Sequence, residues 1–200
     1  GKKEGTYIRI GSTNRKASHE NILELERQKR NISFGEEVDY EIDFNNLDLT
    51  PIKEEFSEKG KEITKNDLIN MNLIKEERDG VYPTKALLIL LGHYENVAIQ
   101  CSRFRGTTME EFLDKKEYTD NIFNQLNNAE QFILNHINIK GKIEGLKRED
   151  VPEIPIEAIR ESLINAFVHR DYSNRGKNIK LGIYDDMVNI VSPGSFPSTL

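Results

Sequence analysis

Apolar residues spaced three and four positions apart predict several helices along this chain. The longest such pattern covers residues 119–138, and shorter ones cover residues 19–30 and 156–168. Apolar or alternating runs predict strands at residues 6–11, 96–104, 178–184 and 187–191. Helices that alternate with strands indicate an α/β fold, an α+β sandwich in which helices pack on a mixed sheet.

The stretch after the first predicted helix carries a different pattern. Residues 31–50 are acidic and weakly periodic, which favours an irregular connection. Pro51 and Thr64 suit the starts of two short helices, and Asp79-Gly80 favours a turn. The segment Ile63 to Thr84 therefore has a helix, a turn and extended residues, an order that resembles a winged helix.

Charge is distributed unevenly along the chain. The formal net charge is -6, which argues against a protein that coats nucleic acid with its whole surface. Residues 1–30 carry eight Lys or Arg against four Glu, whereas residues 31–84 carry six against fourteen acidic residues. Only the N-terminal part therefore suits a polyanion, through Arg9, Arg15 and Lys16. The alternative is that both regions are solvated helical faces.

Other features place the chain among cytoplasmic proteins. The longest apolar run, Ala86 to Leu91, ends at Gly92 and is far shorter than the roughly 20 residues of a membrane span. We expect no membrane partner and no signal peptide. The single cysteine, Cys101, excludes an internal disulfide and favours a reducing compartment. Because Cys101 lies in an apolar strand, we interpret it as a small buried hydrophobe.

Candidate chemistry gathers in residues 157–172, EAIRESLINAFVHRDY. Glu161 and Asn165 are four residues apart, so on a helix their side chains project from one face. Their oxygens suit Mg²⁺ that carries phosphates, and the alternative is an exposed polar face. Directly after this helix stand His169, Arg170 and Asp171. One interpretation is that they form a polar cluster in which Arg170 contacts phosphate. The alternative is a helix C-terminal cap, since His and Arg suit the negative end of the helix dipole. The chain has no P-loop and no closely spaced pair of histidines.

Several phrases of the sequence resemble one family of regulators. The segment IPIEAIRESLINAFVHRDYSNRGKNIKLGIYDDMVNIVSPGSFP resembles a divergent branch of GHKL (Bergerat-type) ATP-binding domains. That branch occurs in bacterial and archaeal transcriptional regulators described as RecG-like or divergent ATPase proteins. YIRIGSTNRKAS resembles the end of the Schlafen AlbA-type domain that precedes it, and YPTKALLILLG resembles the central region.

The resemblance implies roles for particular residues. Glu161 is implied as the general base or water-positioning residue, and Asn165 as the ligand of Mg²⁺ bound to ATP. Gly194 is implied as the glycine that lets the backbone approach the nucleotide, with His169, Arg170 and Asp171 beside it. The family's glycine box begins with Asp and ends with Gly, whereas Ser192 and Phe196 stand there in this chain. We therefore expect at most a weak ATPase in the full-length protein and none in this chain.

The resemblance also implies a division into domains. Residues 1–30 correspond to the end of an AlbA-type DNA-binding domain, residues 31–82 to an acidic connection, and residues 83–200 to a GHKL-like domain truncated at its C-terminus. The expected protein is the central fragment of a transcriptional regulator that binds DNA through the full-length chain. The alternatives are a ligand-free scaffold or homo-oligomerisation module, and a nucleic-acid-binding module that acts through its basic N-terminal part.

Overall fold

A mixed four-stranded sheet lies at the centre of the molecule. The computed structural model describes residues 5–30, 32–144 and 147–194. The sheet order is β10–β9–β5–β6. Its strands are β5 (Ile99–Phe104), β6 (Phe112–Tyr118), β9 (Ile179–Ile183) and β10 (Val188–Val191). β9 pairs with β5 in parallel, whereas β6 and β10 pair antiparallel with their neighbours. The protein therefore has the α/β fold with a mixed sheet that the sequence predicts.

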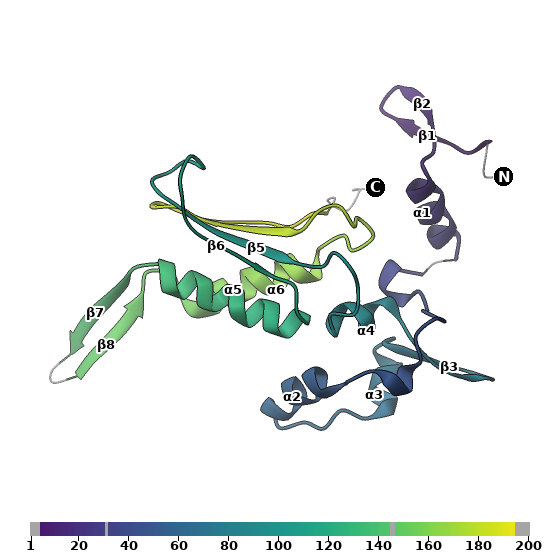
Figure 1. Ribbon diagram of the computed structural model, residues 1–200, viewed down its shortest axis with the longest axis horizontal. Coiled ribbons are helices and arrows are strands. Elements are labelled where there is room, and N and C mark those ends of the chain that lie inside the picture. The colour runs from purple at the N-terminus through teal and green to yellow at the C-terminus, as the bar shows by residue number, and fades with distance from the viewer. Residues whose placement is uncertain (1–4, 31, 145–146, 195–200) are drawn as a thin grey trace.

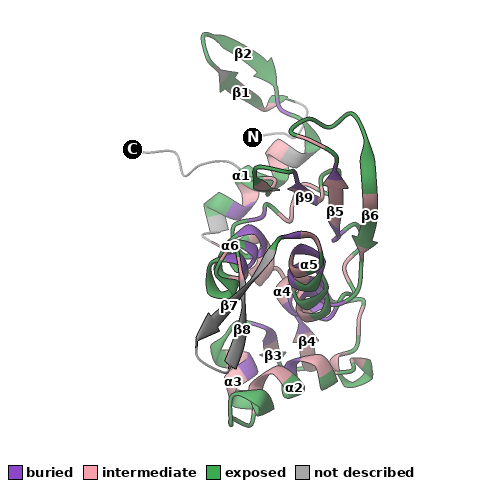
Figure 2. Ribbon diagram, turned by 90° about the vertical axis from the view of Figure 1, so that its left-hand side faces the viewer, coloured by how far each residue is buried: buried purple, intermediate pink, exposed green. Residues whose placement is uncertain are grey.

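Two helices, α5 (Ile122–His136) and α6 (Ile156–Val168), pack on one face of this sheet. Alternate strand residues point to that face, so Ile99, Cys101 and Leu181 are buried while Lys180 is exposed. Figure 2 shows buried residues in β5 and β9 and mostly exposed ones in the edge strand β6. Burial raises the pKa of the Cys101 thiol to about 12, so the thiolate is disfavoured. The interpretation of Cys101 as a small buried hydrophobe is confirmed.

A second, smaller apolar cluster forms between the acidic stretch and the sheet. It is built by α2 (Thr50–Glu58), α3 (Lys65–Asn70), the hairpin β3 (Ile74–Glu77) and β4 (Gly80–Pro83), and α4 (Lys85–Leu90). Ile52, Leu68 and Leu87 are buried there. Two short 3-10 helices, Phe34–Glu36 and Phe44–Asn46, precede α2. The buried members of this cluster thus come from residues 52–91, and α4 contributes to it.

The N-terminal part forms a hairpin followed by a helix. The hairpin consists of β1 (Tyr7–Ile10) and β2 (Thr13–Lys16), and α1 (His19–Arg30) follows it. Ser18 caps α1, because its Oγ accepts a hydrogen bond from the Asn21 backbone N–H at 3.2 Å. Figure 1 shows the hairpin standing away from the four-stranded sheet.

Five strands, β3 among them, arise where the sequence pattern predicts no strand. β2 reads TNRK and β6 has three charged residues at its centre, so neither has the apolar alternation of a half-buried strand. β6 is an edge strand, where Lys side chains disfavour pairing with another chain. β7 (Ile139–Glu144) and β8 (Lys147–Pro152) form an antiparallel hairpin between the two long predicted helices.

Helix α5 is shorter than its periodic pattern suggests. It begins at Ile122 because Asn121 caps it: the Asn121 side-chain oxygen accepts a hydrogen bond from the Asn124 N–H at 2.9 Å. Among the described residues, no helix combines the length and the apolarity that crossing a membrane requires.

Candidate functional site

Helix α6 presents the predicted carboxylate and amide to solvent. Glu161 and Asn165 are both exposed, while Ile159 and Leu163 of the same helix are buried against the sheet. Within the described part of the chain, neither the Glu161 nor the Asn165 side chain makes a hydrogen bond or ion pair. Their oxygens are therefore available on one helix face, as the four-residue spacing predicts.

A groove of about 430 Å³ lies beside these two residues, between α6 and β10. Its lining residues are Ser162, Ala166, Val188, Asn189, Ile190 and Ser192. Ser162 and Ala166 directly follow the two predicted site residues, Glu161 and Asn165, in the sequence. One position corresponds to a rotation of about 100° around the helix. Glu161 and Asn165 therefore flank the groove rather than line it. Sequence spacing does not reveal Ser162 or Asn189, because the groove depends on how α6 packs on β10.

The segment after β10 is joined to the end of α6. Ser192 Oγ donates a hydrogen bond to the Ala166 carbonyl at 2.6 Å, and the Asp171 N–H donates to the Pro193 carbonyl at 2.6 Å. A Cβ at Gly194 would lie 2.9 Å from the His169 carbonyl oxygen. Only glycine fits this close approach to the His169 carbonyl. Packing alone therefore explains why a glycine stands at position 194, without a bound nucleotide. Phe196 lies outside the described residues.

Arg170 is buried and uses its guanidinium inside the protein. It is 5% exposed, and its Nη2 donates to the carbonyls of Asn96 at 2.8 Å and Lys177 at 3.0 Å. The guanidinium also lies 5.1 Å from the Tyr172 ring centroid. Burial lowers the pKa of Arg170, although Tyr172 and Asp171 oppose this shift. Arg170 is thus directed at backbone carbonyls, and its side chain does not extend toward the α6–β10 groove.

His169 and Asp171 have local roles at the end of α6. His169 is the C-cap of the helix, and its N–H donates to the Asn165 carbonyl at 3.0 Å. Asp171 Oδ1 accepts hydrogen bonds from the Ser173 N–H at 3.0 Å and the Ser173 hydroxyl at 2.6 Å. Asp171 lines a cleft of about 910 Å³ toward α1, away from the α6–β10 groove. The structure therefore brings Glu161 and Asn165 together but not Arg170 and Asp171 with them.

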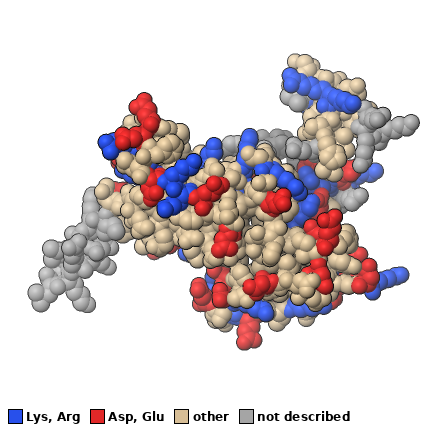
Figure 3. All heavy atoms as spheres, viewed as in Figure 1, with Lys and Arg blue, Asp and Glu red and all other residues tan. Residues whose placement is uncertain are grey.

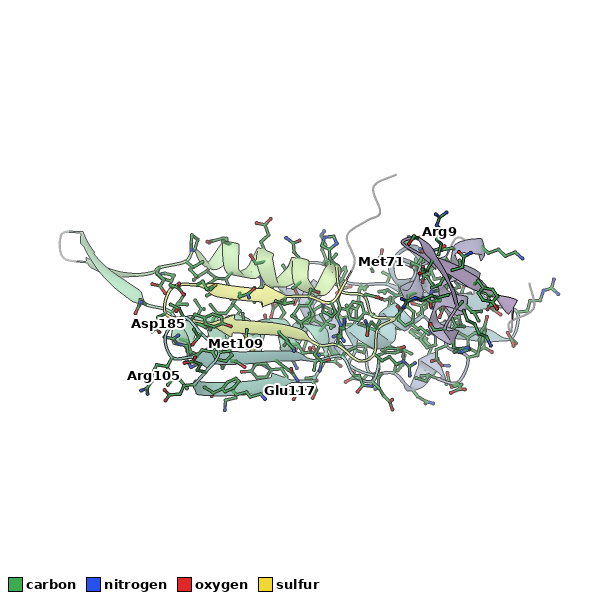
Figure 4. The ribbon with its side chains drawn as sticks, turned by 90° about the horizontal axis from the view of Figure 1, so that it is seen from above. Arg9, Met71, Arg105, Met109, Glu117 and Asp185 are labelled. Atoms are coloured by element: carbon green, nitrogen blue, oxygen red, sulfur yellow. The ribbon has the colours of Figure 1, made fainter. Side chains whose placement is uncertain are left out.

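The second candidate site is the basic N-terminal hairpin. Residues 5–18 contain Arg9, Arg15 and Lys16 and no Asp or Glu. All three cations are exposed, and among the described residues Arg15 and Lys16 have no acidic partner. Figure 3 shows this basic surface on the hairpin, and Figure 4 places Arg9 at the opposite end of the molecule from Asp185.

Helix α1 holds this hairpin to the rest of the protein through Arg27. The Arg27 side chain is 9% exposed, and it pairs with Glu24 at 2.6 Å and with Glu37 at 3.5 Å. Its guanidinium carbon also lies 5.2 Å from the centroid of the Phe34 ring. These contacts attach α1, which follows the hairpin directly, to the segment around Phe34 and Glu37.

The segment Ile63 to Thr84 has a helix and a hairpin where its pattern predicts a helix, a turn and extended residues, but its charge does not suit nucleic acid. Glu76 of β3 pairs with Lys65 at 2.5 Å, and Glu77 accepts a hydrogen bond from the Tyr40 hydroxyl at 2.9 Å. Residues 31–84 carry fourteen acidic against six basic residues, so phosphates are repelled there.

The described residues contain no group of three or more His, Cys, Asp or Glu side chains arranged to hold a metal ion. Any divalent cation at α6 therefore depends on Glu161 and Asn165 with water and a phosphate ligand, the arrangement that Mg²⁺ commonly adopts.

The fold is similar to that of a solved bacterial protein. It aligns with the crystal structure of the DIP2311 protein from Corynebacterium diphtheriae with a TM-score of 0.62 and 22% sequence identity. The alignment covers 97% of this chain and 40% of that chain, so this chain spans less than half the length of that protein. No protein-family model and no curated protein matches the sequence. The comparison shows the fold alone.

Proposed function

We propose that this chain is the central part of a cytoplasmic, DNA-binding transcriptional regulator whose α/β domain has a regulatory or structural role. The observation that carries the proposal is the projecting hairpin, in which Arg9, Arg15 and Lys16 are exposed and no carboxylate is present. The sequence resemblance to RecG-like, divergent ATPase regulators supports the same role. The alternative, a scaffold that forms homo-oligomers without binding a ligand, uses the same α/β domain.

The physical basis is attraction between the hairpin and DNA phosphates. Each cation that contacts a phosphate releases condensed counterions, so binding weakens as salt rises. The body of the protein is acidic, and it confines such contacts to the hairpin.

Removing two hairpin cations tests this proposal. We expect the double variant Arg15→Gln, Lys16→Gln to weaken binding to duplex DNA across sequences, because phosphate contacts carry no base information. The slope of log affinity against log salt should fall by about 1.8, or about 0.9 for each contact. Fluorescence anisotropy of a labelled duplex at several salt concentrations measures both quantities.

The matched control is Lys115→Gln, Lys116→Gln on β6, which removes two adjacent exposed cations from another strand. The control should bind DNA as the unmodified protein does. Equal affinity and equal slope in the hairpin variant and the unmodified protein would contradict the assignment of DNA binding to this hairpin.

A second candidate function is binding of Mg²⁺-ATP at α6. The favouring observation is that the Glu161 and Asn165 oxygens are exposed and unengaged next to a groove of about 430 Å³. In this proposal Asn165 holds the Mg²⁺ and Glu161 orients water near the phosphates. The donor set fits Mg²⁺, but Ser192 uses its hydroxyl on the Ala166 carbonyl and supplies no carboxylate for an adenine amino group. Any ATPase activity is therefore weak.

Calorimetric titration of Mg²⁺-ATP and Mg²⁺-ADP into the chain tests this second candidate. We expect binding that disappears in Asn165→Ala and in EDTA. It should persist in Asn127→Ala, a substitution of an exposed asparagine on α5. If the unmodified chain takes up no nucleotide, α6 keeps its arrangement for packing alone.

A further inference from the structure

The register of the N-terminal hairpin sorts its side chains between two faces. Tyr7 lies opposite Lys16, Ile8 opposite Arg15, and Arg9 opposite Asn14. Because cross-strand partners share a face and successive residues alternate, Tyr7, Arg9 and Lys16 lie on one face. Arg15 lies on the other face with Ile8. The structure therefore places on two different faces the cations that the sequence alone does not distinguish.

Tyr7 is the exposed aromatic residue of the first face, at the open end of the strand pair. Its side chain is 64% exposed. Lys16 is its directly opposed neighbour, at about 5 Å between Cβ atoms, and Arg9 follows two residues along the strand, about 7 Å away. Arg9 Nε donates to the Gly11 carbonyl at 3.1 Å, which orients its guanidinium on the hairpin.

We propose that the Tyr7–Arg9–Lys16 face binds single-stranded nucleic acid. A base stacks on the Tyr7 ring, and Arg9 and Lys16 contact phosphates on either side of that base. The inference rests on the proposed nucleic-acid-binding function and specifies the strand state that the hairpin takes.

The arrangement favours a single strand over a duplex. Stacking on an aromatic side chain needs a base that is not already stacked and paired. A two-stranded ribbon also fits the major groove of a duplex, but the bases there are stacked and paired, so none is free for the Tyr7 ring. The Arg9 guanidinium reaches the tip of the hairpin through its bond to the Gly11 carbonyl, whereas Tyr7 and Lys16 lie at the open end of the strand pair. The exposed Tyr7 ring is therefore the group that favours a single strand.

Competition between strand states tests the proposal. Anisotropy is measured with labelled oligo-dT and oligo-U of about 12 nucleotides and with a duplex, because single-strand sites span about 4–16 nucleotides. We expect Tyr7→Ala to weaken binding to the single strands about 5- to 150-fold, the loss of one stacked base. Tyr7→Phe should keep most of the affinity, since the ring remains, and duplex affinity should not change in either variant. The oligo-dT and oligo-U arms show whether DNA or RNA is the tighter ligand.

The matched control is Tyr40→Ala, because Tyr40 is 62% exposed and lies outside the hairpin. It should leave all affinities unchanged. Unchanged single-strand affinity in Tyr7→Ala, or an equal loss for single strands and duplex, would overturn the stacking proposal while DNA binding stands. Absence of binding to every oligonucleotide at low salt would instead remove the proposed function itself.

Discussion

At the scale of the residue, the contacts of Arg170 could not be predicted from the local sequence pattern. Its position after α6 suggested a phosphate contact or a helix cap. The structure instead directs its guanidinium to the carbonyls of Asn96 and Lys177, and its side chain is buried. Neither partner lies near it on a helix or a strand pair, so no spacing in the sequence reveals the contact. Glu161 and Asn165 differ, because their shared face follows from helical geometry alone.

Gly92 permits a direct test of a residue-scale constraint. Its φ is +77°, and a Cβ there would lie 2.9 Å from the Asn121 backbone nitrogen. Gly60 has a similar φ of +68° but open space around the same position. We expect Gly60→Ala to cost about 1–2 kcal/mol for the left-handed backbone alone. Gly92→Ala should cost about 2–5 kcal/mol, because overpacking adds about 1–3.

Urea unfolding of both glycine variants measures this difference. Equal destabilisation by the two substitutions would mean that the turn after α4 shifts to relieve the contact with Asn121.

At the scale of the element, local periodicity predicted the segments that bury one regular face. Helix α6 matches its predicted bounds of 156–168, and β5, β9 and β10 lie within their predicted runs. β2 and β6 did not show in the pattern because they are short or exposed strands whose pairing partner supplies the structure. A charged segment becomes a strand when a neighbouring strand offers it backbone hydrogen bonds.

At the scale of the whole molecule, α4 joins the two apolar clusters. Leu87 and Leu91 are buried in the smaller cluster, Ile89 is buried in the larger one, and Leu90 packs against both. The expected boundary between residues 82 and 83 thus falls inside β4, two residues before a helix that both cores share. The division of the chain into three domains stays a prediction.

This shared helix predicts that the two clusters unfold together. Leu87→Ala should destabilise the protein by about 2–5 kcal/mol, since Leu87 is fully buried. It should lower the midpoint of a single transition, and Leu163→Ala in the larger cluster should act in the same way. Circular dichroism and tyrosine fluorescence followed during heating would then coincide. An early separate transition in Leu87→Ala, with the main transition unmoved, would show two independent units.

The sequence by itself determined the α/β class, the helices α1, α5 and α6, the buried strands and the placement of three cations in an acid-free segment. These depend on neighbours within a few positions, where helical and strand periods act directly. Only the tertiary structure decided that Arg170 faces backbone carbonyls, that Ser192 bonds to α6, and that Arg15 lies apart from Tyr7, Arg9 and Lys16. Each of these outcomes depends on strand register or on packing between elements, which bring together residues that no local pattern connects.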